Sequence, residues 1–451
     1  MNTRLLEKYN IAAPRYTSYP TVPYWQEEKP SQEAWKTSVL ESFQKGKEIS
    51  LYIHLPYCEA LCTYCGCNKR ITKNHSVEEP YVFSLLREWA MYLELLPEKP
   101  VLRELHLGGG TPTFFQPEVL KYLIETILEG VTLAEEFEFG FEAHPGTTSY
   151  AHLKTLRELG FRRLSIGIQD FAPEILKIIN RHQTYQQVEE VTDWARSLGY
   201  ESINYDLIFG LPLQTPQHIQ ETMDKLKVLQ PERIAFYSYA HVPWIKPSQR
   251  AYSEADLPKG KEKRALYDLG RTLLESLGYT EIGMDHFALP KDSLYQALEA
   301  GTLHRNFMGY TPFSTELNLA LGASSIGDSW NAFVQNEKKI EDYQAAVGEG
   351  KFPITRGHLL TPEDAILRKH ILNVMCRFET SWEIQPGLEQ NLMAAVLPRL
   401  KELVQDGLVC VFPNKIQVTE AGKPFIRNIG LAFDARYWAK KPEGQLFSAV
   451  V

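Results

Sequence analysis

Residues 50–67 read SLYIHLPYCEALCTYCGC, a short apolar run that leads directly into a loop with four cysteines. The run has the length and composition of a buried strand. The loop holds four of the six cysteines in a chain of 451 residues. Cysteines that are so few and so clustered indicate metal ligation in a reducing compartment, because disulfide scaffolds use more cysteines and spread them along the chain.

The spacing of Cys58, Cys62 and Cys65 favours an iron-sulfur cluster over zinc. Thiolates from one tight loop can wrap three corners of a cubane and leave its fourth iron open to a substrate. A structural zinc site closes with four ligands, which usually come as two separated pairs. The chain has no second cysteine pair, because Cys376 and Cys410 stand apart in apolar surroundings. We expect these two to be ordinary buried thiols.

Five further strand-like runs follow the first, with amphipathic helical patterns between them. The runs cover residues 104–107, 138–142, 163–168, 203–208 and 233–238, and the helical patterns include 117–128, 151–159, 185–198 and 215–229. Six β-α units in series predict an α/β fold with a parallel sheet and right-handed crossovers, as an open sheet or as a complete or partial barrel. In each case the ligand site forms at the carboxyl ends of the strands.

Outside this region the two ends of the chain differ in pattern. Residues 14–21, PRYTSYPT, are expected to be extended, with a first helix at about 31–45. Beyond about residue 250 we expect mostly helices, and from about Leu359 helices followed by a hairpin that turns at residues 413–415. Helices followed by a hairpin resemble a winged helix, which either binds DNA or serves as a packing or lid unit. The second role is favoured, because no arginine-rich recognition helix is found.

The charge and hydropathy of the chain disfavour two classes of partner. The formal net charge is -8, whereas proteins that bind nucleic acid usually carry a basic excess. No run of about 18 or more apolar residues is present, and the N-terminus lacks the apolar stretch of a secretory signal. We therefore expect a cytoplasmic protein without a membrane or nucleic-acid partner.

The CxxxCxxC spacing at residues 58–65 is the signature of the radical S-adenosylmethionine (SAM) superfamily, and the match extends well beyond it. The chain resembles oxygen-independent coproporphyrinogen III oxidases, the anaerobic enzymes of haem synthesis. The resemblance covers nearly the whole chain, and its order and spacing are more specific than any one string. It rests on PRYTSYPT (14–21), YIHLPYC (52–58), GGGTPT (108–113), GIQDF (167–171), DLIFGLP (206–212), YAH (239–241), GMDHFA (283–288) and LHRNF (303–307).

The resemblance implies a partial (β/α)6-type radical SAM barrel with additions at both ends. Residues 1–48 would form an N-terminal extension that covers the site, and residues 49–345 the barrel and its extension. Residues 346–451 would form a mostly helical, winged-helix-like domain.

Site residues are implied position by position. Cys58, Cys62 and Cys65 match the ligands of a [4Fe-4S] cluster, whose open iron would be chelated by SAM, whereas Cys67 is not expected to be a ligand. Two SAM molecules are implied. The residues matching contacts to the first are Tyr52, Gly109, Glu142 and Ile326, and those matching contacts to the second are Tyr64, Gly110, Thr111, Gln169, Arg181, Asp206 and Ala240. The glycines would let the backbone approach the ligand closely.

The implied reaction is the oxidative decarboxylation of two propionates of coproporphyrinogen III to vinyl groups, which yields protoporphyrinogen IX. A 5'-deoxyadenosyl radical from SAM would abstract hydrogen from the propionate β-carbon. The implied enzyme is a monomer that receives electrons from a donor such as flavodoxin or ferredoxin.

Two other functions remain open at this point. A haem chaperone of the same superfamily would carry haem without oxidase activity, but such relatives usually lack both the segment at 14–20 and the fourth loop cysteine. A radical enzyme acting on another substrate, such as RNA, is disfavoured by the acidic balance. The chain departs from the family pattern at residues 308–313, which leaves details of the substrate pocket open.

Overall fold

The computed structural model describes residues 3–26, 28–244, 246–442 and 447, and it contains all six expected barrel strands. Each overlaps the predicted run, and the largest difference is at β5, which begins at Thr132 and not at Glu138. Their bounds are β1 (Glu48–Leu55), β4 (Val101–Gly109), β5 (Thr132–Ala143), β6 (Arg163–Gln169), β7 (Ser202–Phe209) and β8 (Arg233–Ser238). All neighbours in this series pair in parallel.

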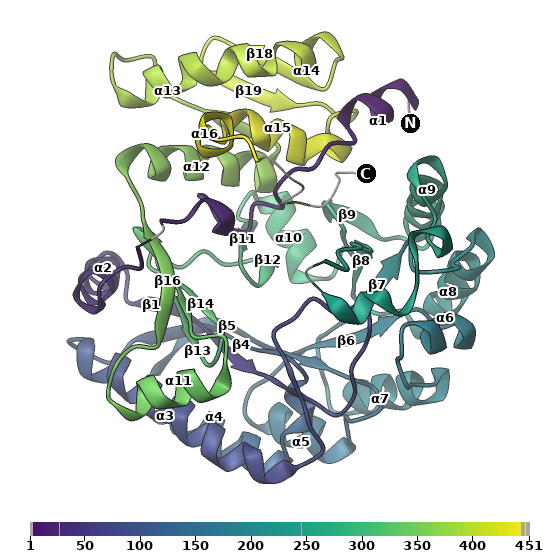
Figure 1. The fold of residues 1–451 in the computed structure, drawn as a ribbon, viewed down its shortest axis with the longest axis vertical. Coiled ribbons are helices and arrows are strands. Elements are labelled where there is room, and N and C mark those ends of the chain that lie inside the picture. Colours follow the sequence, from purple (N-terminus) through teal and green to yellow (C-terminus); the bar gives the residue numbers. More distant parts are fainter. Residues whose placement is uncertain (1–2, 27, 245, 443–446, 448–451) are drawn as a thin grey trace.

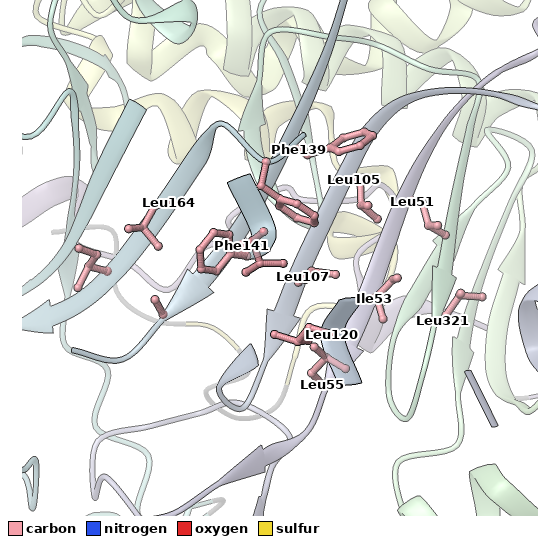
Figure 2. Packing of buried hydrophobic residues seen from close by; sticks show 14 of the residues in the cluster. Leu51, Ile53, Leu55, Leu105, Leu107, Leu120, Phe139, Phe141, Leu164 and Leu321 are labelled. Atoms are coloured by element: carbon pink, nitrogen blue, oxygen red, sulfur yellow. The ribbon is translucent and has the colours of Figure 1, made fainter. Parts of the chain in front are cut away.

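Apolar and polar side chains alternate along these strands, so that each strand has two distinct faces. Figure 2 shows Leu105 and Leu107 of β4 beside Phe139 and Phe141 of β5, together with Leu120 of helix α4 (Pro117–Glu129). These side chains are at most 1% exposed. Burying a large apolar side chain contributes roughly 1.5–3 kcal/mol, so this helix-facing layer is a main source of stability.

The inner face of the sheet is polar. The side chains that point to this face, among them Glu104, Glu138 and Arg163, line a space of about 100 Å³ inside the barrel. Arg163 Nε lies 2.8 Å from Glu138 Oε1, and Glu138 also pairs with Arg233 at 3.3 Å. Barrels of this type usually fill their interior with branched apolar side chains, so charged groups here indicate an interior kept for ligand chemistry.

The barrel is partial. A twelve-stranded sheet runs in the order β16-β15-β14-β13-β1-β4-β5-β6-β7-β8-β10-β9. Strand β13 is parallel to β1, whereas the outer strands at both ends pair antiparallel. Within the described residues the edge strands β16 and β9 pair with one neighbour each, so the sheet stays open. The predicted fold class is confirmed.

Helices cover the outer side of the curved sheet (Figure 1). The four helices predicted between the barrel strands are present within two residues of their expected ends. The covering helices are α3 (Glu78–Leu95), α4 (Pro117–Glu129), α5 (Tyr150–Glu158), α6 (Pro173–Ile178), α7 (Tyr185–Ser197), α8 (Pro216–Leu229) and α9 (Gly260–Ser276).

The expectation that the chain is mostly helical beyond residue 250 is wrong for residues 280–359. Residues 280–359, all of them described, contain two helices, α10 (Ser293–Ala300) and α11 (Ile340–Gly348), among many strands of three to six residues. Such strands are too short to show a period of two, and those buried on both faces do not alternate. They are β9 (Thr280–Gly283), β10 (His286–Ala288), β11 (His304–Asn306), β12 (Gly309–Thr311), β13 (Leu317–Leu321), β14 (Ile326–Asp328), β15 (Ala332–Asn336) and β16 (Ile354–Leu359).

The C-terminal section has the predicted order of helices followed by a hairpin. Its elements are α12 (Pro362–Arg377), β17 (Glu379–Ser381), α13 (Leu388–Val396), α14 (Lys401–Gln405), β18 (Val409–Phe412), β19 (Lys415–Val418), α15 (Ile426–Phe433) and α16 (Ala435–Ala439). Cys376 is buried as expected, but Cys410 is exposed, because β18 is an edge strand whose residues 410–412 face outward.

The N-terminal segment lies between the barrel and the C-terminal helices (Figure 1). It begins with α1 (Thr3–Tyr9), continues as the extended residues predicted at 14–21, and leads to α2 (Gln32–Lys45). Tyr9, Tyr16 and Tyr19 belong to the same buried apolar cluster as the C-terminal helices. The first and last parts of the chain therefore share one core. Of the helices among the described residues, none has the length and apolar character needed to span a bilayer.

Candidate active site

The carboxyl ends of the barrel strands surround a cavity of about 620 Å³. The cysteine loop forms one wall, and the ends of β4, β5, β6 and β7 form the others, as expected for a parallel sheet. Most of the predicted site residues line it, namely Cys58, Cys62, Tyr64, Cys65, Gly109, Gly110, Thr111, Glu142, Gln169, Arg181 and Asp206. The structure thus brings together side chains from residues 58 to 206.

Three predicted residues do not line this cavity. Tyr52 lies behind it, where its hydroxyl is 3.1 Å from His54 Nδ1. The main-chain carbonyl of Ala240 accepts a hydrogen bond from Gln249 at 3.1 Å. Ile326 is the first residue of β14, two strands away from β1.

The cysteine loop is held in place by hydrogen bonds from the turn after α6. The main-chain N–H of Thr63 donates to the carbonyl of Ile179 at 3.0 Å, and Asn180 Nδ2 donates to the carbonyl of Leu61 at 2.7 Å. Short strands at its two ends, β2 (Tyr57–Cys58) and β3 (Arg70–Ile71), pair in parallel and close the loop. The four loop cysteines all line the cavity as a result.

Polar groups contact two of the expected cluster ligands. Cys58 Sγ lies 3.3 Å from Thr111 Oγ1, and Arg181 Nη1 donates to Cys62 Sγ at 3.5 Å. The thiolate is the form that binds metal, and a neighbouring guanidinium stabilises it. Burial acts in the opposite sense and raises the pKa of Cys58 to about 11. An iron at this position would offset that cost, because coordination replaces the proton.

The third expected ligand has the most favourable environment. The hydrogen bond with Cys67, aided by the charge of Lys69, lowers the pKa of Cys65 to about 5. Lys69 Nζ also donates to the carbonyl of Cys65 at 3.2 Å. Among the described residues, no three or more His, Cys, Asp and Glu side chains could hold a metal ion as they stand. The fit to a cluster therefore rests on the shared cavity wall and on these polar neighbours.

Arg181 clamps the cysteine loop against β6. It is 7% exposed, which excludes the alternative of a solvated arginine at a helix end. Nη1 donates to Tyr64 Oη at 3.3 Å in addition to Cys62, Nε donates to Gln183 at 2.8 Å, and Nη2 donates to the carbonyl of Gly167. Most of its five donors are thus used within the protein.

The glycines after β4 are required by the protein backbone itself. A Cβ at Gly109 would lie 2.8 Å from the carbonyl oxygen of Leu55, and one at Gly110 would lie 2.7 Å from Pro56. Gly109 also has φ +125°, a conformation that favours glycine. The expectation invoked ligand approach alone, but the entry of the cysteine loop already crowds these positions.

Two carboxylates face the cavity without a lysine or arginine partner among the described residues. Glu142 accepts from the main-chain N–H of Gly109 at 3.2 Å and lies 3.7 Å from His106. Asp206 accepts from Asn204 at 2.9 Å and from Ser165 at 3.2 Å. Burial and the charge of Glu142 raise the pKa of Asp206 to about 6. The negative charge that Glu142 and Asp206 give to this side of the cavity suits a cationic ligand.

Sequence reasoning missed a segment that braces the cysteine loop from outside. Lys246 Nζ donates to the carbonyl of Gly66 at 2.7 Å, and Ser248 Oγ to that of Thr63 at 3.1 Å. Gln249, 2% exposed, donates to the carbonyl of Tyr64 at 3.2 Å. These contacts join residues nearly two hundred positions apart, so no local pattern could reveal them.

His144 was also missed, although it lines the cavity. Its Nδ1 accepts from the main-chain N–H of Gly146 at 3.0 Å, which leaves the proton on Nε2. Burial, with the charge of Arg181, lowers the pKa of His144 to about 3. His144 therefore presents a neutral N–H donor to a bound ligand.

Comparison with known proteins agrees with this fold. Residues 52–226 match the model of the radical SAM superfamily. The oxygen-independent coproporphyrinogen III oxidase of Pseudomonas aeruginosa is 37% identical over 436 residues, which cover 95% of each chain. The Escherichia coli protein of the same name is 36% identical over 456 residues, which cover 99% of this chain and 98% of the relative.

A solved structure extends the likeness to three dimensions. Coproporphyrinogen III oxidase from Escherichia coli, described as a radical SAM enzyme, superposes with a TM-score of 0.89 at 35% identity. The superposition covers 96% of this chain and 98% of that chain.

Proposed function

This chain belongs to the oxygen-independent coproporphyrinogen III oxidases of the radical SAM superfamily, and we propose that the cysteine-lined cavity is its reaction site. Its function is the anaerobic oxidative decarboxylation of two propionates of coproporphyrinogen III to vinyl groups. The product is protoporphyrinogen IX, an intermediate of haem biosynthesis. Its cofactors are a [4Fe-4S] cluster and SAM.

One observation supports the proposed site above the others. Cys58, Cys62 and Cys65 share a cavity wall with a buried arginine and face two carboxylates that lack a lysine or arginine partner. When bound, the cluster and SAM supply the 5'-deoxyadenosyl radical that abstracts hydrogen from the propionate β-carbon. The protein contributes position and exclusion of water, because a reactive radical must meet only its substrate.

Different residues of the chain position the cluster and the first SAM. Cys58, Cys62 and Cys65 would hold the cluster, and Arg181 keeps the loop against β6. Glu142 lines the same cavity and would attract the positively charged groups of the first SAM. The N-terminal segment and the C-terminal helices cover the mouth of the barrel.

We also propose a second SAM molecule in the same cavity, at Tyr64, Gly110, Thr111, Gln169, Arg181 and Asp206, with Ala240 outside the cavity lining as a further contact. Asp206 is the main support, since a half-buried carboxylate with only neutral donors is stabilised by a cationic ligand. The volume of about 620 Å³ exceeds what one small ligand requires.

The electrons for the reaction enter, we propose, from a flavodoxin or ferredoxin that docks at the cysteine loop. Leu61 is 39% exposed, and Cys67 is exposed as well, so this loop is open to a redox partner. We further propose that the enzyme acts as a cytoplasmic monomer, in agreement with its clustered thiols and acidic balance.

Anaerobic reconstitution with iron and sulfide tests this function. The wild-type protein is expected to cleave SAM under reduction and to convert coproporphyrinogen III into protoporphyrinogen IX. Replacement of Cys58, Cys62 or Cys65 by Ala should abolish both activities and the cluster spectrum. Cys410→Ala is the matched control, because this exposed cysteine lies on the C-terminal hairpin. Haem transfer without turnover would instead identify a chaperone.

A further inference from the structure

A second cavity, outside the cysteine site, is rich in cationic side chains. It has a volume of about 50 Å³ and lies between β8, β9, α9 and the start of α15. Its charged lining residues are Arg15, Arg264, Lys423, Arg427, Glu281 and Asp285. Four cations therefore face two carboxylates.

Several of these charges are balanced by residues outside the cavity. Arg264 pairs with Asp268 at 2.7 Å, and Lys423 pairs with Glu420 at 2.7 Å. Glu281 pairs with Arg271 at 3.1 Å. What remains is a cluster around Arg15, which lies on the N-terminal segment.

Arg15 forms an ion pair with Asp285, yet 33% of its side-chain surface stays exposed. The neighbouring Arg305 is 4% exposed and has no carboxylate within ion-pair distance among the described residues. Arg305 Nε donates to the carbonyl of Arg15 at 3.3 Å, while its Nη1 is buried without a hydrogen-bond partner. A buried charge without an opposite charge is costly, so the region has capacity for an anion.

A third guanidinium adds to this positive field. Arg427 donates from Nε to the carbonyl of Pro14 at 3.2 Å and from Nη2 to that of Ala13. Burial, together with the charges of Arg15 and Arg305, lowers the pKa of Arg427 to about 9. The three arginines are thus close enough to repel one another.

This cluster adjoins the reaction site. The Arg15 guanidinium lies 5.7 Å from the centre of the Tyr237 ring. Tyr237 in turn lines both the cysteine-walled cavity and the polar space inside the barrel. A single side chain therefore separates Arg15 from the cysteine-walled cavity.

We propose that Arg15, supported by the field of Arg305, binds the carboxylate of a propionate that is not reacting. This inference rests on the proposed function, since it takes coproporphyrinogen III as the ligand. A flat macrocycle with propionates around its edge presents one to the radical and others to the far wall. The incoming carboxylate replaces Asp285 on a planar guanidinium that binds carboxylates in a two-pronged manner.

The alternative role of Arg15 is structural, as an anchor that ties the N-terminal segment to Asp285. Two variants separate these roles. Arg15→Gln removes the guanidinium, whereas Asp285→Asn removes only the competing carboxylate. Both break the ion pair, so an anchor would be lost equally in both. A carboxylate subsite is lost in Arg15→Gln alone.

The test uses the cluster-loaded enzyme and measures KM for coproporphyrinogen III. It also measures the Kd of the stable oxidised coproporphyrin III and of its tetramethyl ester by fluorescence. Arg15→Gln is expected to raise KM and the Kd of the acid by about tenfold or more, the usual value of a hydrogen bond between charged groups. The Kd of the ester should change little. Asp285→Asn should bind the acid as tightly as wild type or more tightly.

Arg436→Gln is the matched control, because Arg436 also pairs with a carboxylate from another helix, Asp364 at 2.7 Å, and lines neither cavity. Equal losses in Arg15→Gln and Asp285→Asn, or equal losses for acid and ester, would overturn the inference. So would an unchanged KM in Arg15→Gln. A wild-type enzyme that cleaves SAM but leaves coproporphyrinogen III intact would reject the proposed function instead.

Discussion

Asp206 is unfavourable for the stability of the unliganded protein but favourable for binding a cationic ligand. Its carboxylate is half-buried on β7 and accepts hydrogen bonds from the neutral donors Asn204 and Ser165. Loss of solvation and the charge of Glu142 raise its pKa to about 6. In the unliganded protein its ionised form is therefore less stable than that of a free carboxyl group. A cationic ligand reverses that balance, because its charge stabilises the carboxylate.

This balance predicts a pH-dependent affinity for SAM. As pH falls through about 6, Asp206 takes up a proton and loses its attraction for the ligand. Binding at pH 5 should be about tenfold weaker than at pH 8, and Asp206→Asn should bind weakly at both. Calorimetric titration of SAM into the anaerobic cluster-loaded protein measures this. A variant with the same pH profile as wild type would contradict it.

The pH dependence of protein stability tests the direction of the Asp206 pKa shift. A raised pKa in the folded state contributes stability below about pH 3.8, and that contribution is lost as pH rises through about 6. Asp206→Asn should therefore increase the free energy of unfolding at pH 8, by up to about 3 kcal/mol, and change it little near pH 4.

At this scale the sequence revealed residues that lie in short motifs and missed those that do not. The spacing of Cys58, Cys62 and Cys65 predicts their common cavity wall, because a loop of that length has few ways to present three thiols. His144 and Gln249 carry no such signal. Gln249 acts through a contact with Tyr64 that only the folded chain creates.

Among the elements, α3 shows how one buried charge joins several segments. Glu88 on this helix is 0% exposed. It accepts from the main-chain N–H of Gly322 at 2.9 Å, from Asn336 Nδ2 at 2.7 Å and from Tyr343 Oη at 2.7 Å. One carboxylate thereby links α3 to the turn after β13, to β15 and to α11.

We expect Glu88→Ala to destabilise the protein by at least about 2 kcal/mol. The substitution leaves the buried Gly322 N–H and Tyr343 hydroxyl unpaired, whereas Asn336 keeps its bonds to Gly322 and Ser325, and each unpaired donor costs roughly 1–3 kcal/mol. Glu94→Ala on the exposed face of the same helix is the control and should stay within about 0.5 kcal/mol of wild type. Denaturant unfolding followed by circular dichroism measures both. Equal effects would show that α3 helicity, and not the buried network, was lost.

Element prediction succeeded where pattern and length agree. The barrel strands alternate over six or more residues, and their helices are long and amphipathic, so both kinds could be predicted from the sequence. The strands β9 to β16 could not, because several span three residues and take their pairing from distant partners. β11, for example, pairs only with β12 among the described residues.

At the scale of the whole molecule, the N-terminal segment is bonded to the C-terminal helices. Tyr16 Oη donates to Asp434 at 3.1 Å, and Arg427 binds carbonyls of the N-terminal segment. The division at residues 1–48, 49–345 and 346–451 stays a prediction. β16 continues the large sheet past residue 345, whereas the core shared by the N-terminal tyrosines and the last helices is separate from the barrel core.

Deletion of residues 1–21 should leave the barrel folded and abolish turnover. The barrel core contains none of these residues, whereas the C-terminal core contains three of their tyrosines. Turnover of coproporphyrinogen III should fall by about a hundredfold or more, since the substrate is no longer held in place. Lys8→Ala, which removes surface ion pairs to Asp406 and Glu402, is the control and should retain activity. Full activity of the deletion variant would contradict this role.

The contact between the first and last segments also sets an order of events in the cell. Residues 13–16 are synthesised more than four hundred positions before their partners at 427 and 434. This part of the N-terminal segment therefore cannot pack against those helices until they have emerged from the ribosome. Tyr9, Tyr16 and Tyr19 lack their apolar partners for that interval, so this core is expected to form late in folding.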